Sequence, residues 1–453
     1  MAKQLRSLGL DIGTTTTQLV VSQLTVDNLS SPFAVPQMAI TERKVVYESP
    51  VFFTPLVSGE LVDIPALRQL VTEQYRQAGI TREDVDTGAV IITGETSRKE
   101  NARQVLEGLS DLAGDFVVAT AGPHLESVLA AKGAGSPELS LREGPLLHMD
   151  IGGGTTNLAL IEDGRIVRTG CLNVGGRLAK FDGQGAVTYL SPVLEGLVDW
   201  QVGQIPPSKQ VEQLGLTLVR VLEMAAGLEP VDTLYEKLST REAGTPFPPV
   251  KSGTKIVFSG GVADCMETCL PSLQYGDLGP VLGQCIRESR LWPIQIKGEQ
   301  TIRATVIGAG CYSTQLSGST VYLRKEHLPL KNLPTVIFTE QEQTDPCLSR
   351  LIEERIAQQD TLPVLYFPGF FGASYGQVTA LARAIADGAS DPYRVVVHAD
   401  MAKALGQALA LLKPQREMIC LDSLTLTEGD YLDIGPPVEG SVPVVVKTLA
   451  MNN

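Results

Sequence analysis

The pattern of apolar positions in the first third of the chain predicts strands followed by alternating helices and strands. Buried or half-buried strands are expected at residues 7–12, 19–21, 33–40 and 44–53. A helix is expected between Asp63, which can cap it, and Gly79, which can end it. Helices and strands then alternate at residues 89–93, 98–112, 116–120 and 124–132. We therefore expect residues 1–145 to form a first lobe.

The same order of strands and then helices returns in residues 146–325, which we expect to form a second lobe. Asp163 and Gly164 lie between two apolar runs and predict a tight hairpin. Glycine and proline interrupt residues 173–207, which favours a loop-rich excursion. The remaining expected elements are a helix at 208–227, an insertion at 229–253, a strand at 255–258 and an apolar helix at 304–312.

The last region, residues 330–453, alternates short apolar runs with amphipathic segments. Strands are expected at residues 335–338, 364–367, 394–397 and 418–421, with helices at 346–359, 378–387 and 401–412 between them. Such alternation is typical of an α/β domain. We therefore expect three units, two lobes and a C-terminal α/β domain.

Composition and charge exclude several classes of partner. The chain of 453 residues has a net charge of -14, which argues against nucleic acid and anionic membranes as partners. It has no apolar run of 18 residues and no signal-like N-terminal segment, so we expect a cytoplasmic protein. Seven dispersed cysteines fit reduced thiols better than disulfides. Of these, Cys265 and Cys269 are expected to be buried thiols on one face of a helix.

Candidate chemistry begins with residues 146–156, LLHMDIGGGTT. A strand ends at Asp150, three glycines and two threonines follow, and a second apolar run begins. Backbone N–H groups at such a bend can donate hydrogen bonds to phosphate oxygens, because no side chain blocks their approach. Asp150 is placed to hold a metal ion or a water beside the phosphate. An idle glycine-rich hairpin is the alternative interpretation.

A near copy of this motif near the N-terminus favours the phosphate interpretation. Residues 7–21 contain a strand, then Asp11 to Thr17 (DIGTTTT), then a second apolar run. Two such turns indicate two related lobes that face one anionic ligand. Two further motifs follow, a Gly260-Gly261 pair after a strand and small residues in the helix at 304–312. Glu126, near the start of a helix, is either a favourable N-terminal charge or a carboxylate between the lobes.

In this order the motifs resemble the superfamily of ATPases that includes actin, sugar kinases and heat-shock chaperones. The resemblance covers about residues 7–320 and implies a two-lobed actin-like, ribonuclease H-like α/β fold, here with an additional C-terminal α/β domain. Within that superfamily the chain is similar to the ethanolamine ammonia-lyase reactivating factors. The matching stretches are SLGLDIGTTTTQLVVS, LLHMDIGGGTTNLALIEDGRI, FSGGVADC and YLDIGPPVEGSVPVVVKTLA.

The family resemblance implies a chaperone-like protein that depends on ATP and Mg²⁺. Its partner would be ethanolamine ammonia-lyase that holds a damaged cobalamin, which the factor releases so that intact adenosylcobalamin can bind. The implied location is the bacterial cytoplasm or a bacterial microcompartment. Two alternatives on the same fold stay open, a small-molecule kinase and a filament-forming relative of actin. Self-association stays open as well.

The resemblance also implies roles for individual residues. Asp11 and Asp150 would hold Mg²⁺ on opposite sides of the phosphates, and Glu126 would orient the attacking water. Gly122 stands where chaperone-type members carry a glutamate, so slow ATP turnover is expected. The residues expected to bind the phosphates and the adenosine are Gly13, Thr14, Thr15, Thr16, Gly152, Gly153, Gly154, Thr155, Gly260, Gly261 and Val262.

Overall fold

The structure of the chain is a computed structural model. It describes residues 3–13, 16–29, 38–58, 61–92, 104–105, 109, 119–120, 123–240, 246–251, 253–268, 270–312, 314–318, 320–324, 328–359, 361–426, 430–437 and 441–448. Most of the predicted helix at 98–112 and most of the predicted strands at 33–40 and 116–120 lie outside these ranges. None of the helices that the model describes is long and apolar enough to cross a membrane.

The first lobe is built on a mixed sheet with strand order β3-β2-β1-β7-β8, and β4 pairs with β2. β1 runs antiparallel to β2 and parallel to β7, so the strand that carries Asp11 is central in the sheet. A small β5-β6 hairpin lies beside the sheet. The strands are β1 (Lys3–Ile12), β2 (Thr16–Asn28), β3 (Met38–Glu48), β4 (Phe52–Phe53), β5 (Leu56–Ser58), β6 (Leu61–Val62), β7 (Thr87–Ile92) and β8 (Ala119–Thr120).

Helix α1 (Ile64–Ala78) packs against the first sheet and has both predicted ends. The Asp63 side chain accepts a hydrogen bond from the Ala66 backbone N–H at 3.0 Å. Gly79 ends the helix in the left-handed region with φ 66°, where a residue without Cβ is favoured. The buried side chains of the helix include Leu67 and Val71, as its helical spacing predicts.

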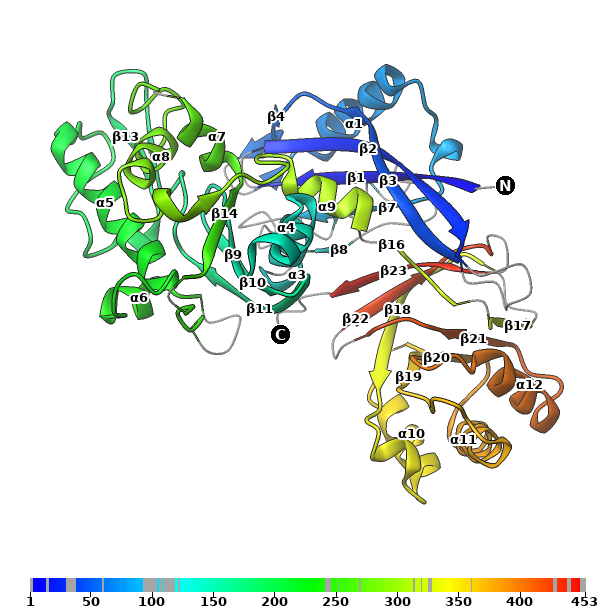
Figure 1. Cartoon of the computed structure of the whole chain (residues 1–453). Coiled ribbons are helices and arrows are strands. Elements are labelled where there is room, and N and C mark those ends of the chain that lie inside the picture. Colours follow the sequence, from blue (N-terminus) through cyan, green and yellow to red (C-terminus); the bar gives the residue numbers. More distant parts are fainter. Residues whose placement is uncertain are drawn as a thin grey trace.

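The second lobe repeats the arrangement with strand order β11-β10-β9-β14-β15. β9 runs antiparallel to β10 and parallel to β14, the same relation that β1 has to β2 and β7. Its elements are β9 (Leu146–Ile151), β10 (Thr156–Glu162), β11 (Arg165–Leu172), β12 (Ala179–Phe181), β13 (Val187–Leu190), α5 (Ser208–Ala225), α6 (Thr233–Leu238), β14 (Lys255–Ser259), α7 (Gly261–Glu267), α8 (Gly279–Arg287) and β15 (Gln295–Ile296). Figure 1 shows this lobe beside the first.

Two helices cross between the lobes and pack against each other. α3 (Pro123–Gly133), which is followed by α4 (Ser136–Glu143), packs on the sheet of the second lobe, although both helices come before that sheet in the sequence. α9 (Ala304–Tyr312) comes after the second sheet in the sequence but packs on the sheet of the first lobe. Their approach depends on glycine, because a Cβ at Gly308 would lie 2.0 Å from the Leu129 carbonyl oxygen. A Cβ at Gly9 on β1 would lie 2.4 Å from the Val306 carbonyl oxygen. The close packing predicted for the helix at 304–312 is therefore present.

The third unit is an eight-stranded sheet with order β16-β23-β22-β18-β19-β20-β21-β17. β18, β19, β20 and β21 are parallel, and α10, α11 and α12 cover one face of them. The elements are β16 (Thr314–Leu316), β17 (Tyr322–Arg324), β18 (Leu330–Ile337), α10 (Leu348–Ile356), β19 (Val364–Phe367), α11 (Tyr375–Gly388), β20 (Tyr393–Val397), α12 (Ala402–Leu412), β21 (Met418–Asp422), β22 (Asp430–Ile434) and β23 (Pro443–Thr448).

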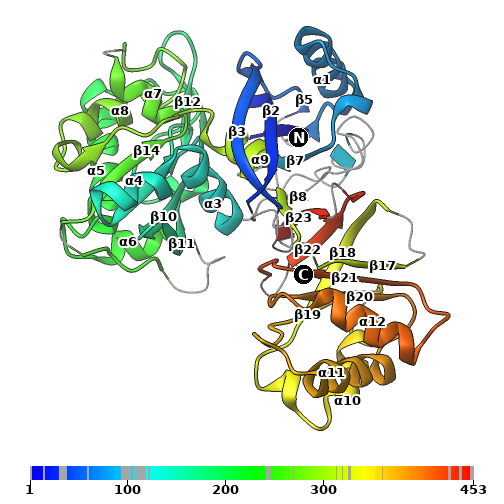
Figure 2. The ribbon, with the colours of Figure 1, turned by 45° about the vertical axis from the view of Figure 1, so that its right-hand side comes forward.

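The third unit adjoins the first lobe (Figure 2). β23 and β16 contact β7 and β3. The hydroxyl groups of Thr87 on β7 and Thr314 on β16 are 2.8 Å apart in a buried hydrogen bond. β16 and β17 precede residue 330, so the sheet of the third unit includes two strands from residues 146–325, which were expected to belong to the second lobe. Movement of the first lobe against the second would therefore carry the third unit with it.

Two local predictions concern loops and cysteines of the second lobe. The region 173–207 is loop-rich, as predicted, and it also contains the β12-β13 hairpin, whose strands are too short to leave a clear pattern. The helix that carries Cys265, α7, ends at Glu267. Cys265 is buried on that helix, and Cys269 lies outside the described residues. Pro271 shortly afterwards disfavours continued helix, since proline restricts the residue before it.

Candidate nucleotide site

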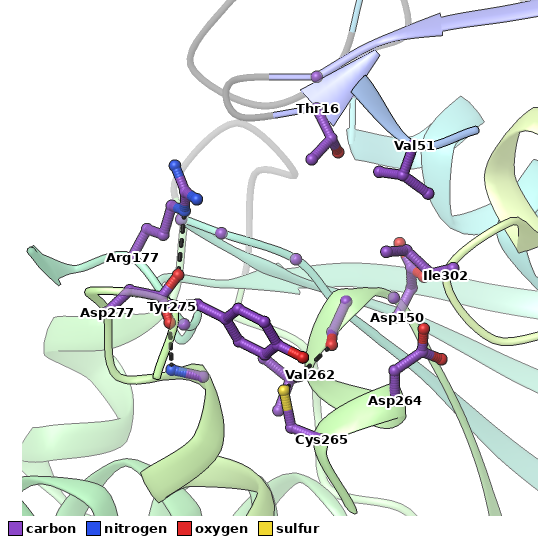
Figure 3. Close-up of a pocket in the computed structure, with 18 of the residues that line it drawn as sticks. Thr16, Val51, Asp150, Arg177, Val262, Asp264, Cys265, Tyr275, Asp277 and Ile302 are labelled. Atoms are coloured by element: carbon purple, nitrogen blue, oxygen red, sulfur yellow. Dashed lines mark hydrogen bonds and ion pairs between the residues drawn. The ribbon is translucent and has the colours of Figure 1, made fainter. Parts of the chain in front are cut away.

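A cavity of about 580 Å³ opens between the two lobes and collects nearly all of the predicted site residues (Figure 3). Thr14 and Thr15 lie outside the described residues. Every other predicted residue lines this cavity: Asp11, Gly13, Thr16, Glu126, Asp150, Gly152, Gly153, Gly154, Thr155, Gly260, Gly261 and Val262. Segments that are far apart in the sequence therefore meet at one place.

The first turn joins β1 to β2 and is held by one hydrogen bond within the turn and by another from Thr54. The Gly13 N–H donates to the Thr16 carbonyl oxygen at 2.9 Å. The Thr54 hydroxyl donates to the Gly13 carbonyl oxygen at 2.7 Å and lies 3.1 Å from the Thr17 hydroxyl. Asp11, at the end of β1, is half-buried. The turn thus holds a carboxylate and the Thr16 hydroxyl at the edge of the cavity.

The second turn joins β9 to β10 and has the same internal hydrogen bond. The Gly152 N–H donates to the Thr155 carbonyl oxygen at 2.9 Å. A Cβ at Gly154 would meet no protein atom within 4 Å, so it would occupy the cavity itself. The Gly176 N–H donates to the Gly152 carbonyl oxygen at 3.0 Å, which ties the turn to the next loop. The two turns are therefore structurally equivalent hairpins, one in each lobe.

Asp150 is a buried carboxylate of the cavity, with 5% of its surface exposed. Its carboxylate accepts hydrogen bonds from the hydroxyl of Ser259 and, at 3.4 Å, from that of Thr305. Burial raises its pKa, while hydrogen bonds from Ser259, Thr305 and Asn157 oppose the rise. A cation in the cavity would favour the ionised form of this group, because an opposite charge nearby lowers a carboxyl pKa.

A buried histidine, His148, contacts Asp150 through the hydroxyl of Ser259. The sequence alone does not indicate this contact. His148 Nε2 lies 2.9 Å from the Ser259 hydroxyl, and Nδ1 lies 2.9 Å from the Ser136 hydroxyl. Ser259 donates its proton to Asp150, so it accepts one from Nε2, and Nδ1 then accepts from Ser136. Burial lowers the pKa of His148 to about 3, so the ring stays neutral. The chain of hydrogen bonds orients the Asp150 carboxylate.

Acid should destabilise the second lobe through His148. In the unfolded chain its pKa is near 6.5, so the unfolded state binds a proton that the native state excludes as the pH falls from about 6.5 towards 3. Stability is therefore lost as the pH falls, by about 2 kcal/mol between pH 6.5 and pH 5. Both tryptophans lie in this lobe, so urea unfolding followed by tryptophan fluorescence at the two pH values measures the effect.

The matched variants for this pH test are His148→Gln and His398→Gln. The first should remove most of the difference between the two pH values, because glutamine does not take up a proton. The second replaces a histidine of the third unit and should leave the difference in place. An unchanged difference in His148→Gln would show that other groups cause the acid sensitivity.

The Gly260-Gly261 pair forms the wall at the start of α7. Gly260 has φ 86°, and a Cβ there would lie 2.4 Å from the Ile151 carbonyl oxygen, so only glycine fits. Its N–H donates to the Thr301 carbonyl oxygen at 3.1 Å. Val262 follows and is buried. The strand β14 therefore passes directly beside β9 and leads the chain into the cavity wall.

The outer end of the cavity holds residues that sequence reasoning did not find. Arg177 Nε lies 3.0 Å from Asp277 Oδ2, and the Gly279 N–H donates to Asp277 Oδ1 at 2.9 Å. The guanidinium of Arg177 also lies 5.8 Å from the ring centroid of Phe53, which comes from the first lobe. Burial raises the pKa of Asp277, opposed by the Gly279 N–H and by Arg177. Arg177 therefore connects both lobes at the cavity mouth.

Tyr275 completes this outer end. Its ring lies across the cavity beside Val262 and Cys265 (Figure 3), and 56% of its surface is exposed. Glu126, in the first turn of α3, lines the cavity as well. The described residues contain no group of three or more histidine, cysteine, aspartate or glutamate side chains that could hold a metal ion.

Two equivalent lobes with crossed helices and a cavity between paired glycine turns define an actin-like fold. The chain belongs to the ethanolamine utilisation protein EutA family, whose model matches residues 3–452. It is 39% identical to the ethanolamine ammonia-lyase reactivase EutA of Escherichia coli (strain K12) and 38% identical to that of Salmonella typhimurium. Each comparison covers 99% of both chains. The predicted fold class and family are confirmed.

Solved structures share less with this chain. The Aquifex aeolicus PPX-GPPA enzyme is 16% identical with a TM-score of 0.35, and it covers 68% of this chain and 90% of its own. MreB 5 of Spiroplasma citri bound to AMPPNP is 16% identical with a TM-score of 0.33, and it covers 67% of this chain and 94% of its own. At these values the likeness supports no conclusion about function.

Proposed function

We propose that this protein is an ATP- and Mg²⁺-dependent reactivating factor for ethanolamine ammonia-lyase. It would release damaged cobalamin from the inactivated lyase so that intact adenosylcobalamin can bind. Membership of the EutA family and similarity to the ethanolamine ammonia-lyase reactivase of Escherichia coli support this choice of partner. The observation that carries the nucleotide part is the pair of equivalent glycine turns, which face one cavity from two lobes.

The residues of the cavity fit a magnesium nucleotide. The open space at Gly154 and the short side chains around it leave backbone N–H groups accessible to phosphate oxygens. Asp11 and Asp150 are the carboxylates at the ends of β1 and β9, and they would hold the hydrated Mg²⁺. When bound, Mg²⁺ would neutralise phosphate charge. Glu126 would orient a water, and we propose that hydrolysis is slow.

The adenosine would lie at the outer end of the cavity. Gly261 leaves room for a flat group, because a Cβ there would meet only the Ile302 side chain, at 3.9 Å. Tyr275 and Val262 line the same cavity. Asp277 is held in place by Arg177 and can accept hydrogen bonds from ribose hydroxyls. Because Arg177 also meets Phe53 of the first lobe, nucleotide binding there would bring the lobes together.

Lobe closure gives a physical route to the release of cobalamin. A ligand shifts a conformational equilibrium only by its difference in affinity for the two states. A nucleotide that touches both turns binds the closed state better. The third unit adjoins the first lobe through Thr87 and Thr314, so it would move with that lobe. We propose that this motion acts on the lyase, in the cytoplasm or in a microcompartment.

Replacement of Tyr275 by alanine should weaken binding of a non-hydrolysable ATP analogue. Loss of one aromatic contact is worth about 1 kcal/mol, which is roughly a fivefold rise in Kd. Isothermal titration calorimetry with Mg²⁺ and the analogue measures it. Tyr375→Ala, on an exposed tyrosine of the third unit, is the matched control and should bind as the unmodified protein does. Equal Kd values for the two variants would place the base elsewhere.

A reactivation assay tests the proposed function. Ethanolamine ammonia-lyase blocked with cyanocobalamin is mixed with the protein, ATP, Mg²⁺ and adenosylcobalamin, and the recovered deamination of ethanolamine is measured. We expect recovery only when protein, ATP and Mg²⁺ are all present. A parallel screen for phosphate transfer from ATP to small alcohols or acids examines the kinase alternative. Transfer without reactivation would overturn the proposal.

A further inference from the structure

A second cavity, of about 560 Å³, lies apart from the nucleotide site. Four elements line it: helix α3, the start of α4, the edge strand β11 and the end of α9. None of its lining residues lines the first cavity. They are His124, Val128, Lys132, Pro137, Glu138, Gly164, Arg165, Ile166, Val167, Arg168, Thr169 and Tyr312. The volume is in the range of small-ligand pockets.

Positive charge predominates in this cavity, although the whole chain has a net charge of -14. Lys132, Arg165 and Arg168 line it, and Glu138 is the acidic residue of its wall. Arg43 adds a further cation beside it, because its guanidinium lies 5.0 Å from the ring centroid of Tyr312. A cluster of cations in an acidic protein creates a local positive potential that attracts anions.

Lys132 is the least compensated of these cations. It lies half-buried on the face of α3 that it shares with His124 and Val128. Burial lowers its pKa, and the nearby Arg43 lowers it further, while Glu138 raises it. Within the described part of the chain it makes no hydrogen bond and no salt bridge. A half-buried ammonium with no hydrogen bond or salt bridge is costly, and a bound anion would reduce that cost.

The arginines of β11 are available to the same ligand. Arg165 is exposed and forms no salt bridge with the described residues. Arg168 contacts the Pro248 carbonyl oxygen at 3.4 Å and lies 5.7 Å from the ring centroid of Phe247, so its charge is not neutralised by a carboxylate. A guanidinium can bind a carboxylate or phosphate through two parallel hydrogen bonds. The cavity is therefore lined by the guanidinium groups of Arg165 and Arg168 on β11 and by the ammonium group of Lys132 on α3.

We propose that this second cavity binds an anionic group, a carboxylate or a phosphate, between Lys132 on α3 and Arg165 on β11. The group could belong to a small free anion or to an acidic side chain of a partner protein. Glu126 lies two residues after His124, about 200° around α3, and faces the nucleotide cavity. An anion in the second cavity therefore contacts the helix that also forms a wall of the first.

Calorimetric titration tests the site, with inorganic phosphate and a glutamate octapeptide as the two probes. The protein is first saturated with ADP and Mg²⁺, and the variants are Lys132→Met and Arg165→Gln. Loss of either cation should raise the Kd of the bound probe on the order of tenfold. Lys209→Met, an exposed lysine of α5, is the control for loss of one positive charge and should change nothing. Arg165 is exposed, so its variant should fold even where Lys132→Met does not.

The results of these titrations distinguish a small free anion from an acidic protein segment, and binding in the second cavity from binding in the first. Binding of phosphate with the expected loss in both variants indicates a small free anion, and binding of the peptide alone indicates an acidic segment. Phosphate held in the first cavity would be insensitive to both variants and would overturn the proposal, as would absence of binding by both probes. Titration of the same variants with the ATP analogue measures nucleotide binding separately. The anion-site proposal can therefore fail while the proposed nucleotide site holds, and the reverse.

Discussion

Replacement of Asp150 by asparagine is expected to abolish ATP-dependent reactivation. The amide keeps the size of the carboxylate but loses the charge that would hold Mg²⁺ beside the second turn. Removal of such a group lowers activity on the order of 100-fold or more. Asp150 is buried and its pKa is raised by that burial, so a neutral side chain should preserve stability. The measurement is the rate of recovered deamination in the reactivation assay.

Asp163→Asn is the matched control for this prediction. Asp163 is an exposed residue in the turn between β10 and β11 with φ 49°, a conformation that asparagine also adopts readily. The control variant should reactivate the lyase at the rate of the unmodified protein. Tryptophan fluorescence should show that both variants are folded. Full reactivation by Asp150→Asn would mean that the nucleotide site has been placed wrongly.

Gly308→Ala is expected to have the largest effect on stability. A Cβ at this position would lie 2.0 Å from the backbone oxygen of Leu129, so α3 and α9 would have to separate. Backbone atoms cannot move aside as a flexible side chain can, and such overpacking costs about 3 kcal/mol. Urea unfolding followed by tryptophan fluorescence measures the loss, because α3 packs on the sheet of the second lobe.

The control for this substitution is Gly376→Ala, near the start of α11. A Cβ there meets no atom within 4 Å, so alanine should change the free energy of unfolding by less than about 1 kcal/mol. If Gly308→Ala were as stable as Gly376→Ala, the two crossing helices would not be packed as described.

Local patterns in the sequence predict the two turns and the crossing helix. Asp11 and Asp150 each follow a buried strand and precede glycine, so the chain itself indicates that the carboxylates stand at strand ends. Gly308 and Gly310 indicate close helix packing, because small residues in an apolar helix leave room for a neighbouring backbone. The alternation of strands and helices after residue 330 likewise predicts the α/β third unit.

Contacts between distant residues could not be predicted in the same way. His148 appears in the sequence as an isolated histidine, and its partner Ser259 is 111 residues away. Arg177 and Asp277 meet across 100 residues, in loops with no recognisable motif. The strands β22 and β23 were not predicted, because they complete a sheet only when its other strands are in place. Such features depend on the packed fold and leave no local signal.

The most direct measurement is the release of cobalamin from the blocked lyase. Lyase that holds cyanocobalamin is incubated with the protein and Mg²⁺, with or without ATP, and free cyanocobalamin is measured by its absorbance after filtration. We expect cyanocobalamin to appear in the filtrate with ATP and the unmodified protein, and to stay on the lyase without ATP or with Asp150→Asn. Equal release with and without ATP, or none with a lyase that a known reactivase can clear, would contradict the proposed function.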